Sequence, residues 1–250
     1  MKPLHLLLTA AIVASSACNA DKGANANATA AGAEVTATPV AAPNNGDWST
    51  IVSQTPEGGF LMGNPAAKVK LIEYGSLTCP HCADFEETGG KSLVDNYVKK
   101  GLVSFEFRNF VRDPYDITAA LIARCGGPAS FFGLTRAFYA EQKDWIAKIQ
   151  AADPAAMQAL QSQPPQAQFK SIADMAGFPA FAALRGVPKA KSEACLADPA
   201  AASALVQMNS DAVSNYSVQG TPSFIINEEL VSGAADWKTL EPAIKAALNG

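Results

Sequence analysis

The chain contains 250 residues, of which 48% are hydrophobic, enough to bury a core as one domain or as one domain with an insertion. The formal net charge is −4 at pH 7, which argues against nucleic acid as a partner, because nucleic-acid binding needs a basic surface. Five cysteines are too few for a disulfide-rich scaffold of this length, so each one has to be interpreted from its own surroundings.

The first residues have the pattern of a bacterial export signal. The positively charged Lys2 precedes an apolar stretch at residues 4–14, which is too short to span a bilayer, since a spanning helix needs roughly 20 residues. Small residues then lead to Cys18, as in lipoprotein signals, although Ser15 stands where those signals usually have leucine. We therefore predict a signal peptide at residues 1–17 and a lipid on Cys18. The lipid would tether the protein in the periplasm or cell envelope, and ordinary signal cleavage is the alternative.

Residues 18–47 are predicted to form a disordered tether. They consist mainly of alanine, asparagine, threonine, glycine and proline, without an aromatic residue. Such a composition cannot bury enough apolar surface to offset the entropy lost on ordering. Order is expected to begin near Trp48. Because export leads to an oxidising compartment, paired cysteines in the rest of the chain are plausible disulfides.

The first ordered elements alternate between strand and helix. A turn cluster at residues 63–67 precedes a stretch at 69–75 that is rich in β-branched and aromatic residues and predicts a buried strand. Helical spacing follows at residues 83–100, weakened by a glycine pair. Apolar and polar residues then alternate at 103–110, which predicts a second strand. The order strand, helix, strand indicates a βαβ unit.

The middle of the chain is rich in alanine and glutamine and has helical periodicity without a strand pattern. Helices are predicted at residues 117–123, 130–149, 154–161, 166–176, 178–184, 189–196 and 199–216. They are followed by strands at 223–227 and 230–231 and by an amphipathic helix at 236–248. The simplest account is an α/β domain in two parts, at residues 48–112 and 215–250, interrupted by a helical insertion at 113–214.

Two cysteines, Cys79 and Cys82, stand two residues apart between the first predicted strand and helix. Such a pair could bind zinc, form a structural bridge or exchange disulfides. Structural zinc needs four ligands, but the only histidine outside the signal is His81, inside the motif, and Cys125 and Cys195 stand alone in predicted helices. A bridge that closes so short a loop would stabilise little. The pattern therefore favours thiol–disulfide exchange and predicts no metal site.

The start of a helix is a position that activates a cysteine. The sulfur of Cys79 would face unpaired backbone N–H groups and the positive end of the helix dipole, which stabilise a thiolate. Pro80 suits the first helical position, and His81 can add a hydrogen bond or positive charge near the sulfur. A stabilised thiolate makes the disulfide a strong oxidant. We therefore predict that Cys79 is the accessible nucleophile and that Cys82, one turn further on, is its buried partner.

The stretch IEYGSLTCPHCADFEE at residues 72–87 resembles the thioredoxin superfamily and, within it, the DsbA-like thiol:disulfide oxidoreductases of the bacterial envelope. The Pro-His pair between the cysteines is similar to DsbA, whereas thioredoxin usually carries Gly-Pro, and the Phe-Glu-Glu run after the motif is also DsbA-like. The triplet Gly-Thr-Pro at residues 220–222 looks like the cis-proline loop of the family. The resemblance extends over about residues 60–250 and implies a thioredoxin-like fold with an inserted α-helical domain.

The resemblance also implies roles for residues outside the cysteine pair. Glu73 coincides with the buried acidic residue beneath the active site, and its apolar neighbours predict burial. A raised pKa would let Glu73 relay a proton for Cys82, whereas a solvent-facing glutamate is the alternative. Pro222 is expected to be cis, leaving the backbone at Thr221 and Pro222 free to pair with a substrate chain; a trans proline that opens a strand is the alternative. Glu86 is expected to be a solvated helix residue, and a role in tuning Cys79 is the alternative.

The two remaining cysteines, Cys125 and Cys195, lie on two predicted helices of the insertion. In an exported chain such an even pair favours a second disulfide, and some DsbA-like proteins are similar in having a structural or tuning disulfide there. Two buried thiols are the alternative.

Together these patterns predict a protein dithiol oxidase that forms disulfides in exported proteins through Cys79 and Cys82. A disulfide isomerase or reductase would use the same residues. Family isomerases usually carry a separate dimerisation domain where this chain has its tether, so a monomer is expected. A rival of another class is a non-enzymatic thioredoxin-like lipoprotein that binds a metal or a partner protein. We expect no cofactor; the expected partners are reduced exported proteins and a membrane protein that reoxidises the pair.

Overall fold

The computed structural model describes residues 37–250. The predicted signal peptide, Cys18 and most of the predicted tether lie outside the described residues. The ordered part begins upstream of Trp48, earlier than the composition suggests. The Val40 N–H donates to the carbonyl of Lys100 (2.9 Å), the indole of Trp48 donates to the carbonyl of Val40 (2.8 Å), and Ala37 packs against the core. The last part of the predicted tether is therefore held by specific contacts that composition alone does not reveal.

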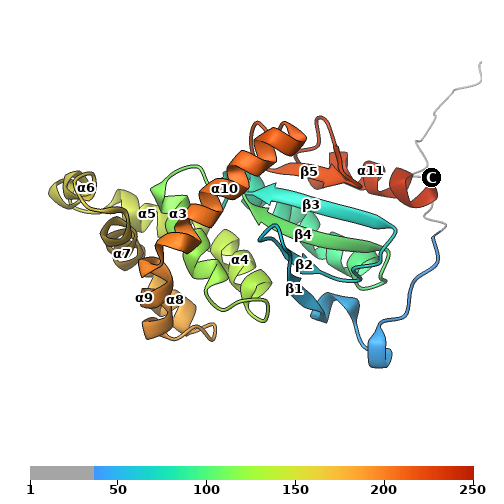
Figure 1. The fold of residues 1–250 in the computed structure, drawn as a ribbon, viewed down its shortest axis with the longest axis horizontal. Helices are drawn as coiled ribbons and strands as arrows, with labels where there is room; N and C mark the ends of the chain where they lie inside the picture. Colours follow the sequence, from blue (N-terminus) through green and yellow to red (C-terminus); the bar gives the residue numbers. More distant parts are fainter. Residues whose placement is uncertain (1–36) are drawn as a thin grey trace, which may run out of the picture. The chain divides into compact units, whose positions relative to one another are not determined.

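Six strands in the described part of the chain form one mixed sheet, in the order β1-β2-β4-β3-β5-β6. The central strands β3 (Val69–Gly75) and β4 (Val103–Asn109) pair in parallel, and β5 (Ser223–Ile226) pairs antiparallel with the other side of β3 (Figure 1). The edges are formed by three short strands, β1 (Val52–Gln54), β2 (Phe60–Met62) and β6 (Glu229–Leu230). The sequence patterns miss β1 and β2, because three residues are too few to show alternation.

The connection from β3 to β4 is helical but irregular. It consists of α1 (Pro80–Phe85), a π-helical turn (Glu86–Gly90), α2 (Lys91–Leu93) and a second π-helical turn (Val94–Val98). The predicted weak point at the glycine pair is therefore a π-helical turn. A Cβ on Gly89 would lie 2.6 Å from the Cβ of Trp237, so the missing side chain lets the C-terminal helix approach.

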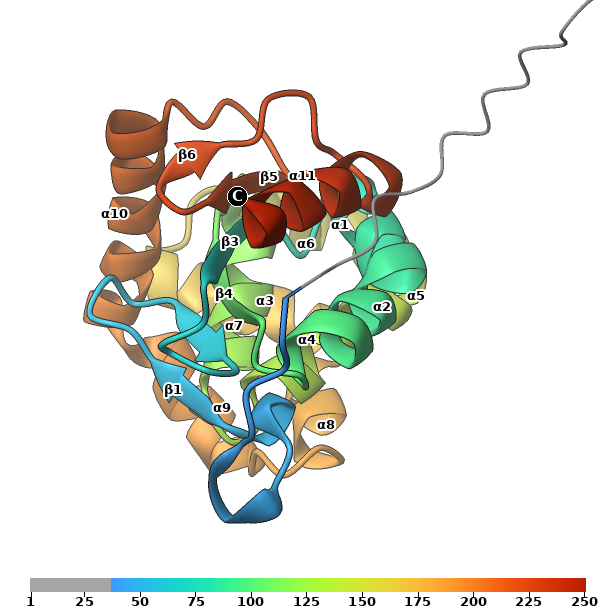
Figure 2. The ribbon, with the colours of Figure 1, turned by 90° about the vertical axis from the view of Figure 1, so that its right-hand side faces the viewer.

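Different helices cover the two faces of the sheet, because successive strand residues point to opposite sides. On one face, Leu71 and Phe224 belong to the main core together with side chains of α1, α2 and α11 (Trp237–Asn249). On the other face, Tyr74 and Ile225 pack with residues of α10 (Pro199–Tyr216). Figure 2 shows α10 on one side of the sheet and α1 and α2 on the other.

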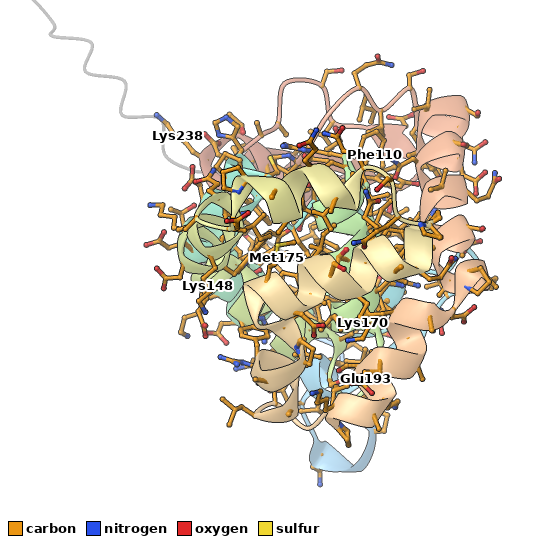
Figure 3. All side chains as sticks on the ribbon, turned by 90° about the vertical axis from the view of Figure 1, so that its left-hand side faces the viewer. Phe110, Lys148, Lys170, Met175, Glu193 and Lys238 are labelled. Atoms are coloured by element: carbon orange, nitrogen blue, oxygen red, sulfur yellow. A yellow bond between two sulfur atoms is a disulfide. The ribbon has the colours of Figure 1, made fainter. Side chains whose placement is uncertain are left out.

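The helical insertion lies between β4 and β5 in the chain (Figure 1). Its helices are α3 (Pro114–Arg124), α4 (Phe131–Ala140), α5 (Gln142–Gln150), α6 (Pro154–Leu160), α7 (Pro165–Ala176), α8 (Phe178–Ala183), α9 (Lys189–Ala197) and α10 (Pro199–Tyr216). Charged side chains such as Lys148, Lys170 and Glu193 project from its outer surface (Figure 3). In the part of the chain that the structure describes, no helix is both long and apolar enough to cross a bilayer.

The single helix predicted at residues 130–149 is wrong, because α4 ends before Glu141 and α5 starts at Gln142. Tertiary contacts stabilise the break between α4 and α5. The indole N–H of Trp145 donates to the carbonyl of Phe138 (2.9 Å), and its ring packs edge-on against Phe138 and Phe178. These partners are set by the fold, so the periodicity of the segment gives no sign of the break.

A disulfide joins Cys125, at the end of α3, to Cys195 in α9, with the two Cα atoms 5.8 Å apart. The two cysteines are 70 residues apart in sequence, so the bridge closes a long loop in the unfolded chain and stabilises the folded insertion.

Removing this disulfide should destabilise the protein. We expect reduction of the Cys125–Cys195 bridge to lower the free energy of unfolding by about 2–4 kcal/mol, because the unfolded chain regains the entropy of the closed loop. The measurement is urea unfolding with and without reductant in a C79A/C82A background, in which no other described disulfide responds. Equal unfolding midpoints under the two conditions would contradict a stabilising role.

Candidate active site

The pairing of β5 with β3 brings the cysteine motif and the proline loop together. Tyr74, near the end of β3, pairs with Ser223, the first residue of β5, so the loops that continue from these ends meet at one edge of the sheet. The Thr221–Pro222 peptide bond is cis. The Cys79 thiol donates to the carbonyl of Thr221, with Sγ and the oxygen 3.3 Å apart. Residues 142 positions apart in sequence therefore form one site.

Cys79 occupies the N-cap of α1. Its backbone is extended (φ −83°, ψ 120°), Pro80 takes the first helical position, and the Cys79 carbonyl accepts from the Ala83 N–H at 3.3 Å. This is the position predicted from the sequence. The predicted accessibility is wrong, however, because Cys79 is only 2% exposed and Cys82 is fully buried. The proline loop packs against the Cys79 sulfur, an arrangement that local sequence does not reveal.

The two thiols of the pair, both unbridged in the structure, have very different acidities. The pKa of Cys79 is lowered to about 5, mainly by a hydrogen bond from the Cys82 thiol. Contributions from Thr221 and from the backbone N–H groups of Cys82 and His81 also lower it, against the opposing effect of burial. Burial raises the pKa of Cys82 well above its ordinary value, and the hydrogen bond to Cys79 and the nearby Glu73 raise it further. The site therefore supports a thiolate on Cys79 and a proton on Cys82.

His81 contributes to the site through its backbone rather than through its ring. Its N–H helps to lower the pKa of Cys79. The imidazole is 76% exposed, and its Nδ1 lies 3.9 Å from a carboxylate oxygen of Asp84. The sequence-based expectation that the ring contacts the sulfur is therefore corrected, since a side chain at the second position of the helix points outward to solvent.

Two glutamates near the cysteine pair have raised pKa values. Glu73 is 2% exposed, and its Oε1 has no hydrogen-bond partner among the described residues. Burial raises its pKa well above the usual range, with further contributions from Glu86 and Cys79. Glu86 is half-buried with its carboxylate 3.4 Å from Arg136, and burial raises its pKa to about 6, so the expectation of a solvated residue is wrong. Helix α4, which carries Arg136, comes from the insertion and encloses this residue.

Sequence reasoning misses two buried polar residues that contact the loop before Cys79. The carboxylate of Asp116 accepts from the Ser76 hydroxyl (2.6 Å) and from the Leu77 N–H (2.8 Å). The amide of Gln142 donates to the carbonyls of Leu77 (2.8 Å) and Cys79 (2.9 Å). Both residues belong to the insertion and lie far from the motif in sequence. The only local signal for Asp116 is its place in the first turn of a helix, which is common for aspartate.

Comparison with known proteins places the chain in a family. A family model described as Thioredoxin matches residues 55–246. The chain belongs to the thioredoxin family. The fold predicted from the sequence, thioredoxin-like with an inserted α-helical domain, is confirmed. Among the described residues, no group of three or more His, Cys, Asp or Glu side chains is arranged to hold a metal ion.

Two solved structures illustrate the relationship. A protein-disulfide isomerase from Novosphingobium aromaticivorans is 40% identical, with a TM-score of 0.72 over 76% of this chain and 97% of that one. Wolbachia pipientis alpha-DsbA1, at 21% identity and a TM-score of 0.62 over 79% of this chain and 94% of that one, shares the fold.

Sequence relatives are provisionally named protein-disulfide oxidoreductases. The Rickettsia bellii protein is 32% identical over 88 residues, which is 35% of this chain and 34% of the relative. The Rickettsia conorii protein is 32% identical over 90 residues, which is 36% of this chain and 32% of the relative. The chain thus spans about a third of the length of these relatives.

The buried carboxyl of Asp116 should make stability depend on pH. Burial raises its pKa from 3.8 to about 7, although its hydrogen bonds oppose the rise. The folded state therefore holds a proton that the unfolded chain has lost, and stability falls as pH rises from about 4 to about 7. The slope is at most about 1.4 kcal/mol per pH unit for one proton. We expect D116N, which cannot ionise, to show a shallower fall in urea-unfolding free energy. Because Glu73 acts in the same direction in both proteins, the difference between the two curves is the readout. Parallel curves would contradict the assignment.

Proposed function

We propose that the chain is a protein dithiol oxidase that introduces disulfides into exported proteins through Cys79 and Cys82. The observation that carries the proposal is the opposite displacement of the two thiol pKa values, with Cys79 at about 5 and Cys82 well above its ordinary value. A stable Cys79 thiolate favours the reduced form of the pair, and a pair that favours its reduced form oxidises other dithiols.

The proposed reaction transfers two electrons from two substrate thiolates to the Cys79–Cys82 disulfide. A substrate thiolate attacks Cys79 Sγ of the oxidised pair, a substrate–Cys79 disulfide forms, and Cys82 leaves as a thiolate. The raised pKa of Glu73 supports a protonated carboxyl that gives its proton to this sulfur. A second substrate thiolate then attacks the substrate sulfur, closes the substrate disulfide and releases Cys79. The low pKa of Cys79 makes it a good leaving group.

The proline loop is the proposed site of substrate pairing. Pro222 is buried and the carbonyl of Thr221 lies 3.3 Å from the reactive sulfur, so a chain that reaches Cys79 also meets this backbone. Because Cys79 is almost completely buried, the proposal includes a small displacement of the loop when substrate binds. An extended substrate segment would then add to the backbone as a strand does.

A disulfide isomerase is the second candidate. The observation in its favour is the 40% identity to a protein titled a protein-disulfide isomerase. An isomerase has to release the same substrate sulfur that it attacks, so a low pKa of Cys79 also suits it. Oxidation of a reduced model protein and rearrangement of a scrambled one separate the two activities. The rival of another class, a lipoprotein that binds a metal or partner without catalysis, would show neither.

The proposed oxidase activity implies a redox partner and a cellular location for the protein. An oxidase needs its pair reoxidised after each turnover, and we propose a membrane redox protein as the partner. The export pattern at residues 1–17 and the small residues before Cys18 support a location in the periplasm or cell envelope with a lipid tether. A monomer is proposed.

The reduction potential of the pair tests the direction of electron flow. We expect a value near that of strong oxidants, about −120 mV, and not near −270 mV as in thioredoxin. Equilibration with glutathione buffers gives this number. The reduced protein should also resist urea better than the oxidised protein at pH 7. Because the folded-state pKa of Cys79 is depressed to about 5, this advantage should shrink as the pH falls through 5. A potential near −270 mV would favour a reductant.

Replacing the nucleophile tests the mechanism directly. We expect C79S to lose oxidation of a reduced model protein, since no mixed disulfide can form at serine. C82S, in which Cys79 is a free thiol, should instead accumulate a mixed disulfide with a substrate that already carries a disulfide: Cys79 attacks that disulfide, one substrate thiol leaves, and Cys82 is absent and cannot displace the substrate from Cys79. The measurements are loss of substrate thiols and trapping of the mixed disulfide on non-reducing gels. Unchanged oxidation by C79S would overturn the mechanism.

A further inference from the structure

The loop that carries Cys79 is held between two buried side chains of the helical insertion. Asp116, in the first turn of α3, accepts from Ser76 and Leu77, at 2.6 and 2.8 Å. Gln142, the first residue of α5, donates from one side-chain nitrogen to the carbonyls of Leu77 and Cys79, at 2.8 and 2.9 Å. Each contact is made to the short segment that leads from β3 into α1.

Gln142 contacts the two carbonyls that bracket Thr78 and Cys79. A side-chain amide nitrogen carries two N–H donors, and both are used, so the amide fixes the peptide planes on either side of these two residues. Gln142 is itself 4% exposed, so its amide has almost no access to water as an alternative hydrogen-bond partner. The loop conformation is thus tied to the position of α5.

The break between α4 and α5 places the amide at the loop. Glu141 has φ −104° and ψ 17°, outside the helical values on either side, and its carboxylate lies 2.6 Å from Arg185, two residues after the end of α8. The bond from the Trp145 indole to the Phe138 carbonyl supports the same break. Contacts of Glu141 and Trp145 with other parts of the insertion therefore fix the start of α5, where the side chain of Gln142 reaches the active-site loop.

We propose that Gln142 is a positioning residue that sets the acidity of Cys79 by holding the cysteine at the mouth of α1. The proposal deepens the oxidase function by naming the part of the insertion that tunes it. The thiolate depends on N–H groups of His81 and Cys82 and on the Cys82 thiol. These donors act only while the Cys79 side chain stays over the start of the helix. Because Pro80 has no N–H, the Cys79–Pro80 peptide has its carbonyl as its one hydrogen-bonding group, and Gln142 binds that carbonyl.

The contrasting interpretation is that Gln142 is a buried amide with a structural role alone. The chain offers a matched control for this, because Gln168 in α7 also donates from its side-chain amide to a backbone carbonyl of the insertion, that of Leu160, at 3.1 Å. Gln168 does not contact the active-site loop in any described hydrogen bond. Replacing either glutamine by methionine keeps the approximate volume and removes one amide.

The test is the ionisation of Cys79 in the full chain, followed in the reduced protein by thiolate absorbance and by alkylation rate against pH. Near pH 5, where half of the wild-type thiol is ionised, we expect Q142M to lower the alkylation rate by roughly threefold or more and to move the ionisation midpoint upward. Q168M should keep the wild-type curve even if it loses comparable stability in urea. If Q142M does not fold, Q142N retains the amide on a shorter side chain that cannot reach both carbonyls, and the same upward displacement is expected.

A Q142M or Q142N curve that coincides with those of wild type and Q168M would overturn the proposal and leave Gln142 a structural residue. An equal displacement in Q142M and Q168M would overturn it as well, because the effect would then follow from stability alone. The ionisation curve needs no protein substrate. A wild-type protein that lacks oxidase activity would therefore refute the proposed function, while a displacement specific to Gln142 would still support the positioning role.

Discussion

The antiparallel pairing of β5 with β3 is the constraint on which the site depends. It places the start of β5 beside the end of β3, so that the Thr221–Pro222 loop lies against the sulfur of Cys79. The thiol is therefore buried next to a backbone that an incoming chain can meet. The helices on both faces keep the sheet in this arrangement.

Burial by itself raises the pKa of both cysteines and of Glu73, but the resulting pKa values differ. It raises the pKa of Cys82 and of Glu73, because neither has enough donors to compensate for lost water. Cys79 escapes this effect because the Cys82 thiol, Thr221 and the first N–H groups of the helix lower its pKa. Both thiols are buried, so the difference between their pKa values depends on where the hydrogen-bond donors lie.

The insertion is part of the site as well as of the fold. Helices α3 and α5 supply the side chains of Asp116 and Gln142 that contact the active-site loop, and α4 supplies Arg136 beside Glu86. The disulfide between Cys125 and Cys195 links two helices of the same block. Through these contacts the helical insertion reaches the loop that carries Cys79. In the sequence, the boundary between the insertion and the α/β domain is marked only by a change of composition.

Local sequence determined much of this protein. The spacing of Cys79 and Cys82 between a strand and a helix, the proline after the first cysteine and the long alanine-rich interruption were enough to predict an α/β domain with a helical insertion and the N-cap position of the nucleophile. The resemblance of residues 72–87 and 220–222 to a known family implied the thioredoxin-like fold. Such features depend on residues that are neighbours in the chain. Tertiary structure alone decided the burial of Cys79, the outward position of the His81 ring, the break before Gln142 and the enclosure of Glu86. Each of these features depends on a contact with residues far away in sequence. The periodicity of a segment predicts its secondary structure but not which residues will pack against it.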